Sequence, residues 1–118
     1  MTIDKPWGKY TVLEEGNGYK IKRIEVNPKE SLSLQSHRCR SEHWVVVSGK
    51  ASIVNGNDDL LLAVGESTYI AVGSKHRLSN FSDEKLTIIE VQIGDYLGED
   101  DILRFDDIYG RTDSVSSQ

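Results

Sequence analysis

The sequence has a single cysteine, only two prolines and no long apolar run. One cysteine cannot form an internal disulfide, so the fold has to be held together by its core. Without about 18 consecutive apolar residues there is no candidate membrane span, and we expect no membrane partner. The first residues also lack the charged-then-apolar layout of a signal peptide. We therefore expect a cytoplasmic protein in a reducing compartment.

Basic residues are also fewer than acidic ones: the sequence has 14 Lys and Arg and 19 Asp and Glu, which gives a net charge of −5. This balance argues against a general nucleic-acid binder. A small phosphorylated ligand stays open, because a few local basic side chains decide whether one is bound. A chain of 118 residues is expected to form one domain, residues 1–118, with one hydrophobic core.

Short apolar and β-branched runs, separated by Gly, Asn, Ser or Asp, predict an all-β fold of the sandwich or small-barrel kind. A slip in the apolar phase of the strand at 19–26 predicts a bulge near Lys22 and Arg23. Outside the strands we expect an irregular arm at residues 1–9, a short helical segment at 99–105 and a frayed polar tail at 111–118. The predicted strands cover residues 10–13, 19–26, a segment from 32 onward, 44–47, 51–54, 60–64, 67–70, 77–80 and 86–93.

Polar side chains that bind metals gather after Gln35, between two apolar strand-like segments. Buried polar groups need partners, and one metal ion satisfies several of them at once. The period of two along a strand puts Gln35, His37 and Cys39 on one face, and Glu42 follows just before a rigid apolar strand. His76 begins another strand after a turn, and closure of a sheet into a barrel brings such strand ends together.

Two imidazoles, one carboxylate and one amide oxygen would suit Zn²⁺, and also Co²⁺, Mn²⁺, Fe²⁺ or Ni²⁺. Three or four protein ligands with an open position are typical of a catalytic metal site. His43 neighbours Glu42 in the predicted strand, so we expect its ring on the opposite face. Cys39 is either a small buried filler near the site or a fifth ligand, and as a thiolate it would favour Zn²⁺.

The spacing of these residues resembles the two motifs of the cupin superfamily. The second motif, Gly-x5-Pro-x-Gly-x2-His-x3-Asn, fits from Gly65 to Asn80, with Ala71 in place of the proline and His76 as the ligand. The resemblance implies a cupin-type double-stranded β-helix, or jelly roll.

The first motif, Gly-x5-His-x-His-x3/4-Glu-x6-Gly, fits in two registers. Pairing His37 with Cys39 leaves only two residues before Glu42, which is too short. Pairing Gln35 with His37 leaves four, and it puts Lys29 at the position of the motif's first glycine. We prefer this second register, in which the resemblance implies as metal ligands Gln35, His37, Glu42 and His76.

Four segments, 5–10, 19–24, 41–49 and 94–102, narrow the resemblance to the C-terminal domain of type II mannose-6-phosphate isomerases, which are bifunctional enzymes that also carry mannose-1-phosphate guanylyltransferase. The similarity covers about residues 5 to 111. It implies a metal-dependent interconversion of mannose 6-phosphate and fructose 6-phosphate, in the supply of GDP-mannose for polysaccharide synthesis. The sequence has no glycine-rich nucleotide loop, so guanylyl transfer is not expected from this chain.

The resemblance also suggests roles for residues around the ligands. Arg40 matches an arginine that the family uses in isomerase catalysis, and its fork suits phosphate or enediolate oxygens. The family usually has histidines at the positions of Arg38 and Cys39, and this departure leaves the activity open. Glu90 is a candidate acid–base group if it faces the interior. Phosphate-binding candidates are Lys20, Lys22 and Lys75, although solvated surface lysines would look the same.

Two other functions stay open at this point. A non-catalytic cupin would bind a sugar phosphate, or would dimerise with a separate guanylyltransferase. A different cupin chemistry, such as oxidation by oxygen at Fe²⁺, has no local support. Cupins commonly form dimers by exchanging edge strands, so we expect a homodimer, with Trp7 of the N-terminal arm packed across the partner.

Overall fold

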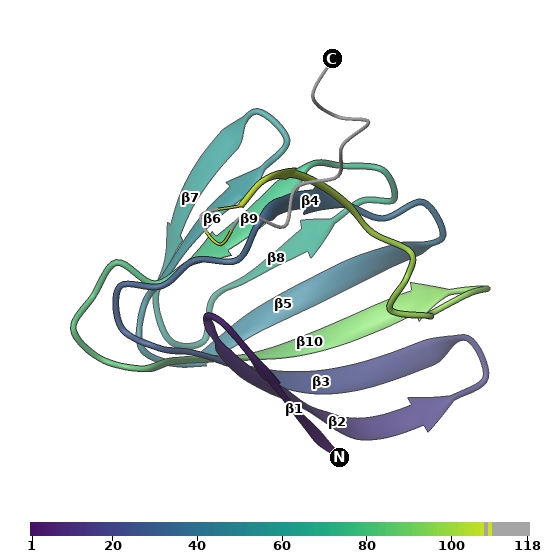
Figure 1. Cartoon of the computed structure of the whole chain (residues 1–118), viewed down its shortest axis with the longest axis horizontal. Helices are drawn as coiled ribbons and strands as arrows, with labels where there is room; N and C mark the ends of the chain where they lie inside the picture. The colour runs from purple at the N-terminus through teal and green to yellow at the C-terminus, as the bar shows by residue number, and fades with distance from the viewer. Residues whose placement is uncertain (108, 110–118) are drawn as a thin grey trace.

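The computed structural model of the chain describes residues 1–107 and 109. These residues form two antiparallel sheets that enclose a shared interior (Figure 1). The strands are β1 (Thr2–Lys5), β2 (Gly8–Gly16), β3 (Tyr19–Val26), β4 (Leu34–Ser36), β5 (Arg40–Ser48), β6 (Ala51–Asn55), β7 (Asp58–Leu62), β8 (Ser67–Ile70), β9 (His76–Ser79), β10 (Leu86–Gly94) and β11 (Leu103–Asp106).

The order of the strands is that of a jelly roll, as predicted. The six-stranded sheet runs β1-β2-β3-β10-β5-β8, and the five-stranded sheet runs β11-β4-β9-β6-β7. Strands far apart in the sequence therefore lie side by side, with β10 between β3 and β5. This order brings β3, β5 and β10 into one wall and β4, β9 and β11 into the other, and a site between the walls can draw on distant parts of the chain.

The predicted helical segment at 99–105 is wrong, and the described residues contain no helix. Residues 103–106 form β11, which pairs with β4 through Leu103 opposite Ser36 and Arg104 opposite Gln35. The polar composition of this segment resembles that of a solvated helix. A neighbouring strand with free backbone groups overrides such a weak local preference.

The predicted irregular arm is also wrong, because residues 2–5 form strand β1 in a hairpin with β2. Trp7 lies in the hairpin turn and packs in the core of its own chain, where it is 5% exposed. Glycine is required at position 8, because φ is +150 and a Cβ atom there would lie 2.1 Å from the carbonyl oxygen of Glu25. The tail predicted at 111–118 lies outside the described residues.

The bulge predicted near Lys22 in β3 lies instead in the neighbouring strand β2. It falls in β2 between Val12 and Glu14, opposite Lys22 and Ile21, whereas β3 pairs with β10 without interruption. The inward residues of β3 are Lys22, Ile24 and Val26. The apparent slip in phase arises because a lysine occupies an inward position that is normally apolar.

The interior is apolar at one end and polar at the other. The apolar part consists of buried aliphatic and aromatic side chains: Trp7, Tyr10, Ile24, Val26, Trp44, Val46, Ala51, Ile53, Ile70, Leu78, Leu86 and Ile88. Along β5 and β10 the same inward face continues into charged residues, namely Glu42 and Arg40 on β5 and Glu90 on β10. Burying so many charges needs a compensating network.

Candidate functional site

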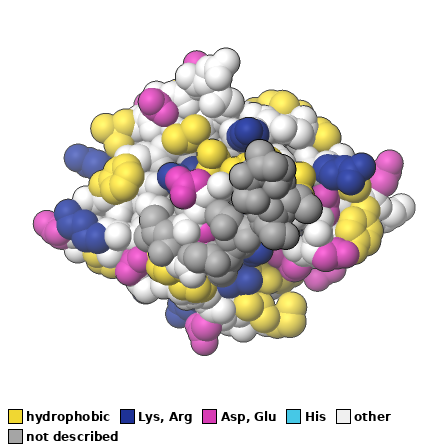
Figure 2. Space-filling view, turned by 45° about the horizontal axis from the view of Figure 1, so that its top comes forward, with side chains coloured by type: hydrophobic (Ala, Val, Ile, Leu, Met, Phe, Trp, Pro, Cys, Tyr) yellow, Lys and Arg dark blue, Asp and Glu magenta, His cyan; other side chains and the backbone are white. Residues whose placement is uncertain are grey.

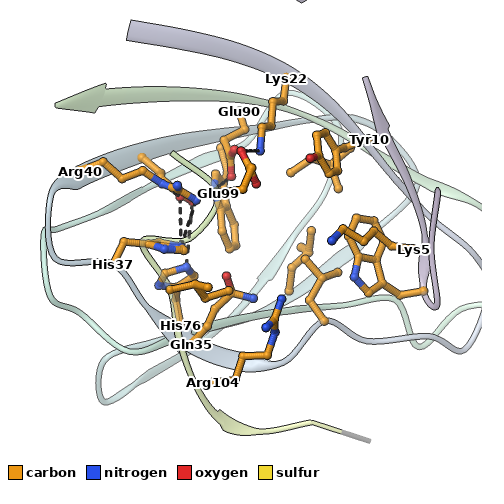
Figure 3. A pocket seen from close by; sticks show the side chains of 17 residues that line it. Lys5, Tyr10, Lys22, Gln35, His37, Arg40, His76, Glu90, Glu99 and Arg104 are labelled. Carbon is orange, nitrogen blue, oxygen red and sulfur yellow. Dashed lines mark hydrogen bonds and ion pairs between the residues drawn. The ribbon is translucent and has the colours of Figure 1, made fainter. Parts of the chain in front are cut away.

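A pocket opens between the two sheets at the polar end of the interior (Figure 3). It holds about 750 Å³ of space free of protein atoms, part of it open to solvent. Its lining residues come from eight strands and from the segments before β2, β4, β5 and β11, and are Lys5, Trp7, Tyr10, Lys22, Ile24, Leu32, Gln35, His37, Arg40, Glu42, Trp44, His76, Leu78, Glu90, Glu99, Ile102 and Arg104.

Both pocket histidines are fixed in the same tautomer by backbone carbonyls. His37 Nδ1 lies 2.7 Å from the carbonyl oxygen of Asp101, and His76 Nδ1 lies 3.0 Å from that of Ser74. A carbonyl oxygen only accepts hydrogen bonds, so each Nδ1 carries the proton and each Nε2 has a free lone pair. This is how proteins orient metal-binding histidines.

Burial keeps both rings neutral. Burial and the neighbouring Arg40 lower the pKa of His37 to about 4, and burial lowers the pKa of His76. Metal binding needs neutral imidazole, so neither ring has to lose a proton at neutral pH.

The two Nε2 lone pairs converge on the carboxylate of Glu42. His37 Nε2 is 3.3 Å from Glu42 Oε2, and His76 Nε2 is 4.0 Å from Glu42 Oε1. One ligand atom from each of these three buried residues fits within 4.8 Å of the others. Neutral imidazole nitrogens and carboxylate oxygens all carry lone pairs. Their close approach is therefore stable only with a cation or a hydrogen-bond donor between them.

Arg40 supplies positive charge at this focus. Its Nε donates to Glu42 Oε2 at 2.7 Å, and its Nη2 donates to His37 Nε2 at 3.2 Å. The guanidinium therefore contacts two of the three atoms that a metal would use. Its remaining nitrogen, Nη1, is buried without a hydrogen-bond partner among the described residues. An oxygen of a ligand would satisfy that donor.

A second buried carboxylate adjoins the first. Trp44 Nε1 donates to Glu42 Oε1 at 2.9 Å and to Glu90 Oε2 at 3.1 Å, so one indole joins the two. Glu90 also accepts from Gln92 Nε2 at 2.8 Å. Burial and then the charge of Glu42 raise the pKa of Glu90. Glu90 thus faces the interior, as its candidate acid–base role requires.

The turn before β9 orients the His76 side chain toward the residues of the first cupin motif. Gly73 lies in the left-handed region at φ +80, and its N–H donates to the carbonyl oxygen of His37 at 2.9 Å. Gln35 pairs with His76 across β4 and β9, and its side chain lines the pocket while its Nε2 donates to Ser33 Oγ at 3.0 Å. The four predicted ligands therefore line one pocket. Lys29, at the motif's glycine position, has φ 64, which supports the chosen register.

Several predicted residues lie elsewhere. Cys39 is exposed and outside the pocket, because the chain bends at residues 38–39 and breaks the alternation that had placed it beside His37. Lys20 donates to the carbonyl oxygen of Leu97 and lies 3.6 Å from Glu99 Oε2, and Lys75 stacks over Phe105 with Nζ 4.3 Å from the ring centroid. Neither lysine lines the pocket. His43 is exposed on the outer face, as predicted.

Lys22 lies inside, but it is already paired. Its Nζ donates to Glu99 Oε2 at 2.7 Å and lies 4.1 Å from the ring centroid of Tyr10. Figure 3 shows Lys22, Glu90 and Glu99 grouped on one side of the pocket. These contacts hold Lys22 against a carboxylate instead of presenting it to a phosphate.

Sequence reasoning missed two residues that organise the site. Asp101 accepts from the N–H groups of Arg38 and Cys39, each at 2.9 Å, while its own carbonyl orients His37. It is more than 60 positions from them, and no local pattern signals such a contact. Arg104 enters the pocket from β11, a strand that was expected to be helical.

Comparison with known proteins identifies the family. The family described as "Mannose-6-phosphate isomerase C-terminal" matches residues 1–107. The chain belongs to this family. It is 53% identical over 110 residues to the xanthan biosynthesis protein XanB of Xanthomonas campestris, which covers 93% of the chain and 24% of that protein. It is 50% identical over 109 residues to a mannose-1-phosphate guanylyltransferase of Escherichia coli, covering 92% of the chain and 23% of the relative. The chain thus spans about a quarter of the length of the curated relatives it matches.

Solved structures show the same fold. A predicted oxalate decarboxylase from Thermotoga maritima matches with a TM-score of 0.70 and 17% identity, covering 80% of this chain and 90% of that one. A sugar phosphate isomerase of the cupin superfamily from Silicibacter pomeroyi matches with a TM-score of 0.66 and 18% identity, covering 72% and 58%. The cupin fold expected from the motifs is therefore confirmed. No helix in the described part of the chain is long and apolar enough to span a membrane.

Proposed function

We propose that this chain is a metal-dependent isomerase that interconverts mannose 6-phosphate and fructose 6-phosphate. The observation that carries the proposal is the convergence of two neutral imidazole lone pairs on one buried carboxylate, with both rings oriented by backbone carbonyls. The family and the pocket between the sheets support it. We propose that it contributes to GDP-mannose supply, because the curated relatives carry polysaccharide-biosynthesis and guanylyltransferase names. We also propose that it acts as a cytoplasmic homodimer.

The donor set fits a divalent cation. His37, Glu42 and His76 would hold it, and the amide oxygen of Gln35 lines the same pocket. Nitrogen and oxygen donors favour Zn²⁺ first, with Co²⁺, Mn²⁺, Fe²⁺ and Ni²⁺ as alternatives. Arg40 would have to release His37 Nε2 and Glu42 Oε2 as the cation binds, which frees its guanidinium for the substrate.

The reaction moves a proton between C1 and C2 of the sugar through an enediolate. A bound divalent cation would supply positive charge that stabilises the enediolate oxygens. Arg40 is aimed at the same region and offers N–H donors to those oxygens. Glu90 is the pocket carboxylate next to Glu42 that is not a proposed ligand, and we assign it the acid–base role.

The test is an isomerase assay on purified protein with its metal content measured. We expect turnover of mannose 6-phosphate when Zn²⁺ or Co²⁺ is bound, and loss of turnover after chelation that returns on adding metal. Glu90→Gln should retain the metal and lose turnover by about 100-fold or more, as expected for a general acid–base group. Metal-loaded, folded protein without turnover would refute the proposal.

A second function is a binding module without catalysis. It is favoured by Arg40, which without a metal already pairs with the Glu42 carboxylate and donates to His37 Nε2. In that case sugar phosphate would bind to metal-free protein as tightly as to metal-loaded protein, and no isomerisation would occur. Copurification with a guanylyltransferase would point the same way.

A further inference from the structure

We propose that Arg104 and Lys5 bind the phosphate group of the substrate, at the side of the pocket away from His37 and Arg40. The inference rests on the proposed function for the identity of the sugar phosphate. Its physical basis is separate. It is the unequal number of acidic side chains on the two walls of the pocket.

The two walls differ in their acidic residues. The pocket carboxylates are Glu42 on β5, Glu90 on β10 and Glu99, which pairs with Lys22 of β3, so they belong to the side of the six-stranded sheet. The five-stranded sheet lines the pocket with His76, Leu78, Gln35 and Arg104 and contributes no carboxylate among the described residues. A phosphate dianion would meet less repulsion on this second wall.

Register places Arg104 two strands away from His76. Arg104 lies opposite Gln35, and Gln35 lies opposite His76, so the three residues form one row across β11, β4 and β9. Neighbouring strands are about 4.8 Å apart, which puts the backbone of Arg104 roughly 10 Å from that of His76. A hexose phosphate has its phosphate on C6 and its reacting carbons at C1 and C2. This row can therefore hold the two ends of the molecule apart.

Lys5 approaches the same space from the other sheet edge. It ends β1 and lines the pocket beside Trp7. In Figure 3, Arg104 and Lys5 both extend into the pocket, whereas His37 and Arg40 lie at its opposite side. On the outer surface, by contrast, basic and acidic groups are interspersed (Figure 2). In the pocket, the carboxylates gather on the side of the six-stranded sheet, where Lys22 and Arg40 pair with them. Arginine forks are well matched to phosphate oxygens.

The test compares ligands with and without the phosphate. Calorimetric binding of mannose 6-phosphate, mannose and inorganic phosphate would be measured for the wild type and for Arg104→Gln, Arg104→Lys and Lys5→Gln. We expect Arg104→Gln to weaken mannose 6-phosphate and phosphate binding by about 10- to 100-fold and to leave mannose binding unchanged. Arg104→Lys should recover part of the loss, and Lys5→Gln should show a smaller loss of the same kind. The control, Arg23→Gln, removes a charge from the outer face of β3 and should change nothing.

Kinetics separates this inference from the proposed function. If the wild type isomerises the sugar, Arg104→Gln should raise KM and change kcat little, because the residue acts far from C1 and C2. If the wild type binds the sugar in a phosphate-dependent way but shows no turnover, the proposed function is refuted. Arg104 would then still belong to an anion-binding site. Equal affinity for mannose and mannose 6-phosphate, or unchanged phosphate affinity in folded Arg104→Gln and Lys5→Gln proteins, would overturn the inference.

Discussion

Trp44→Phe offers the sharpest test of how the buried carboxylates are held. The indole N–H is shared by Glu42 Oε1 at 2.9 Å and Glu90 Oε2 at 3.1 Å, and both acids are under 5% exposed. Phenylalanine keeps an aromatic ring but removes this donor and some of the buried volume. After the change, Glu42 keeps its bond from Arg40, and Glu90 keeps its bond from Gln92.

The expected cost follows from these contacts. A hydrogen bond to a charged group contributes about 1.5–3 kcal/mol, and one shared donor is lost here. Trp7→Phe is the matched control, because it shrinks an equally buried indole that contacts neither acid in the hydrogen-bond network described. Trp44→Phe should therefore lower the free energy of unfolding by about 1.5–3 kcal/mol more than Trp7→Phe does.

The measurements are urea unfolding of the metal-free proteins and titration with Zn²⁺. Because Trp44 orients Glu42, its loss should weaken metal affinity by about 10- to 100-fold, as for other groups that hold a metal ligand in place. Equal unfolding free energies for the two variants, or unchanged Zn²⁺ affinity in Trp44→Phe, would show that the indole does not organise the carboxylates.

Three further predictions follow from the same structure. His76→Ala should remove bound metal and isomerase activity together, whereas His43→Ala, on the exposed outer face, should retain both in metal analysis and assay. Leu78→Ala should cost about 2–5 kcal/mol in urea unfolding, since Leu78 is 1% exposed, and a loss below 1 kcal/mol would contradict its place in the core. Burial would raise the pKa of Glu99, but the charge of Lys22 overcomes it, and the pKa lies below the ordinary 4.5. The Glu99 contribution to stability is therefore present above pH 4.5 and lost as the pH falls through the lower folded-state pKa, so Glu99→Gln should flatten this part of the stability–pH curve.

The local pattern indicated that Gln35, His37 and Glu42 would lie together, because they are close in sequence and the strand period is rigid, and the structure places all three in one pocket. The distant His76 came from the second motif. Glu42 and His43 face opposite sides of β5, as the period of two requires. The same reasoning failed for Cys39, where a bend interrupts the strand and turns the side chain outward. It also failed for the phosphate candidates, because a lysine gives no sign in sequence of the carboxylate or ring that it will meet. Lys22 and Lys75 both show this, with Glu99 and Phe105 as their partners.

The sequence by itself determined the all-β class, the cupin motifs and the set of candidate metal ligands, because these depend on local alternation and motif spacing. Only the tertiary structure decided which partners these side chains acquire. The hydrogen bonds that complete the pocket join residues more than 40 positions apart, such as Asp101 with His37 and Glu90 with Trp44. The edge strands β1 and β11 likewise form because neighbouring strands offer them backbone partners. Such contacts depend on the path of the whole chain, which no local segment encodes.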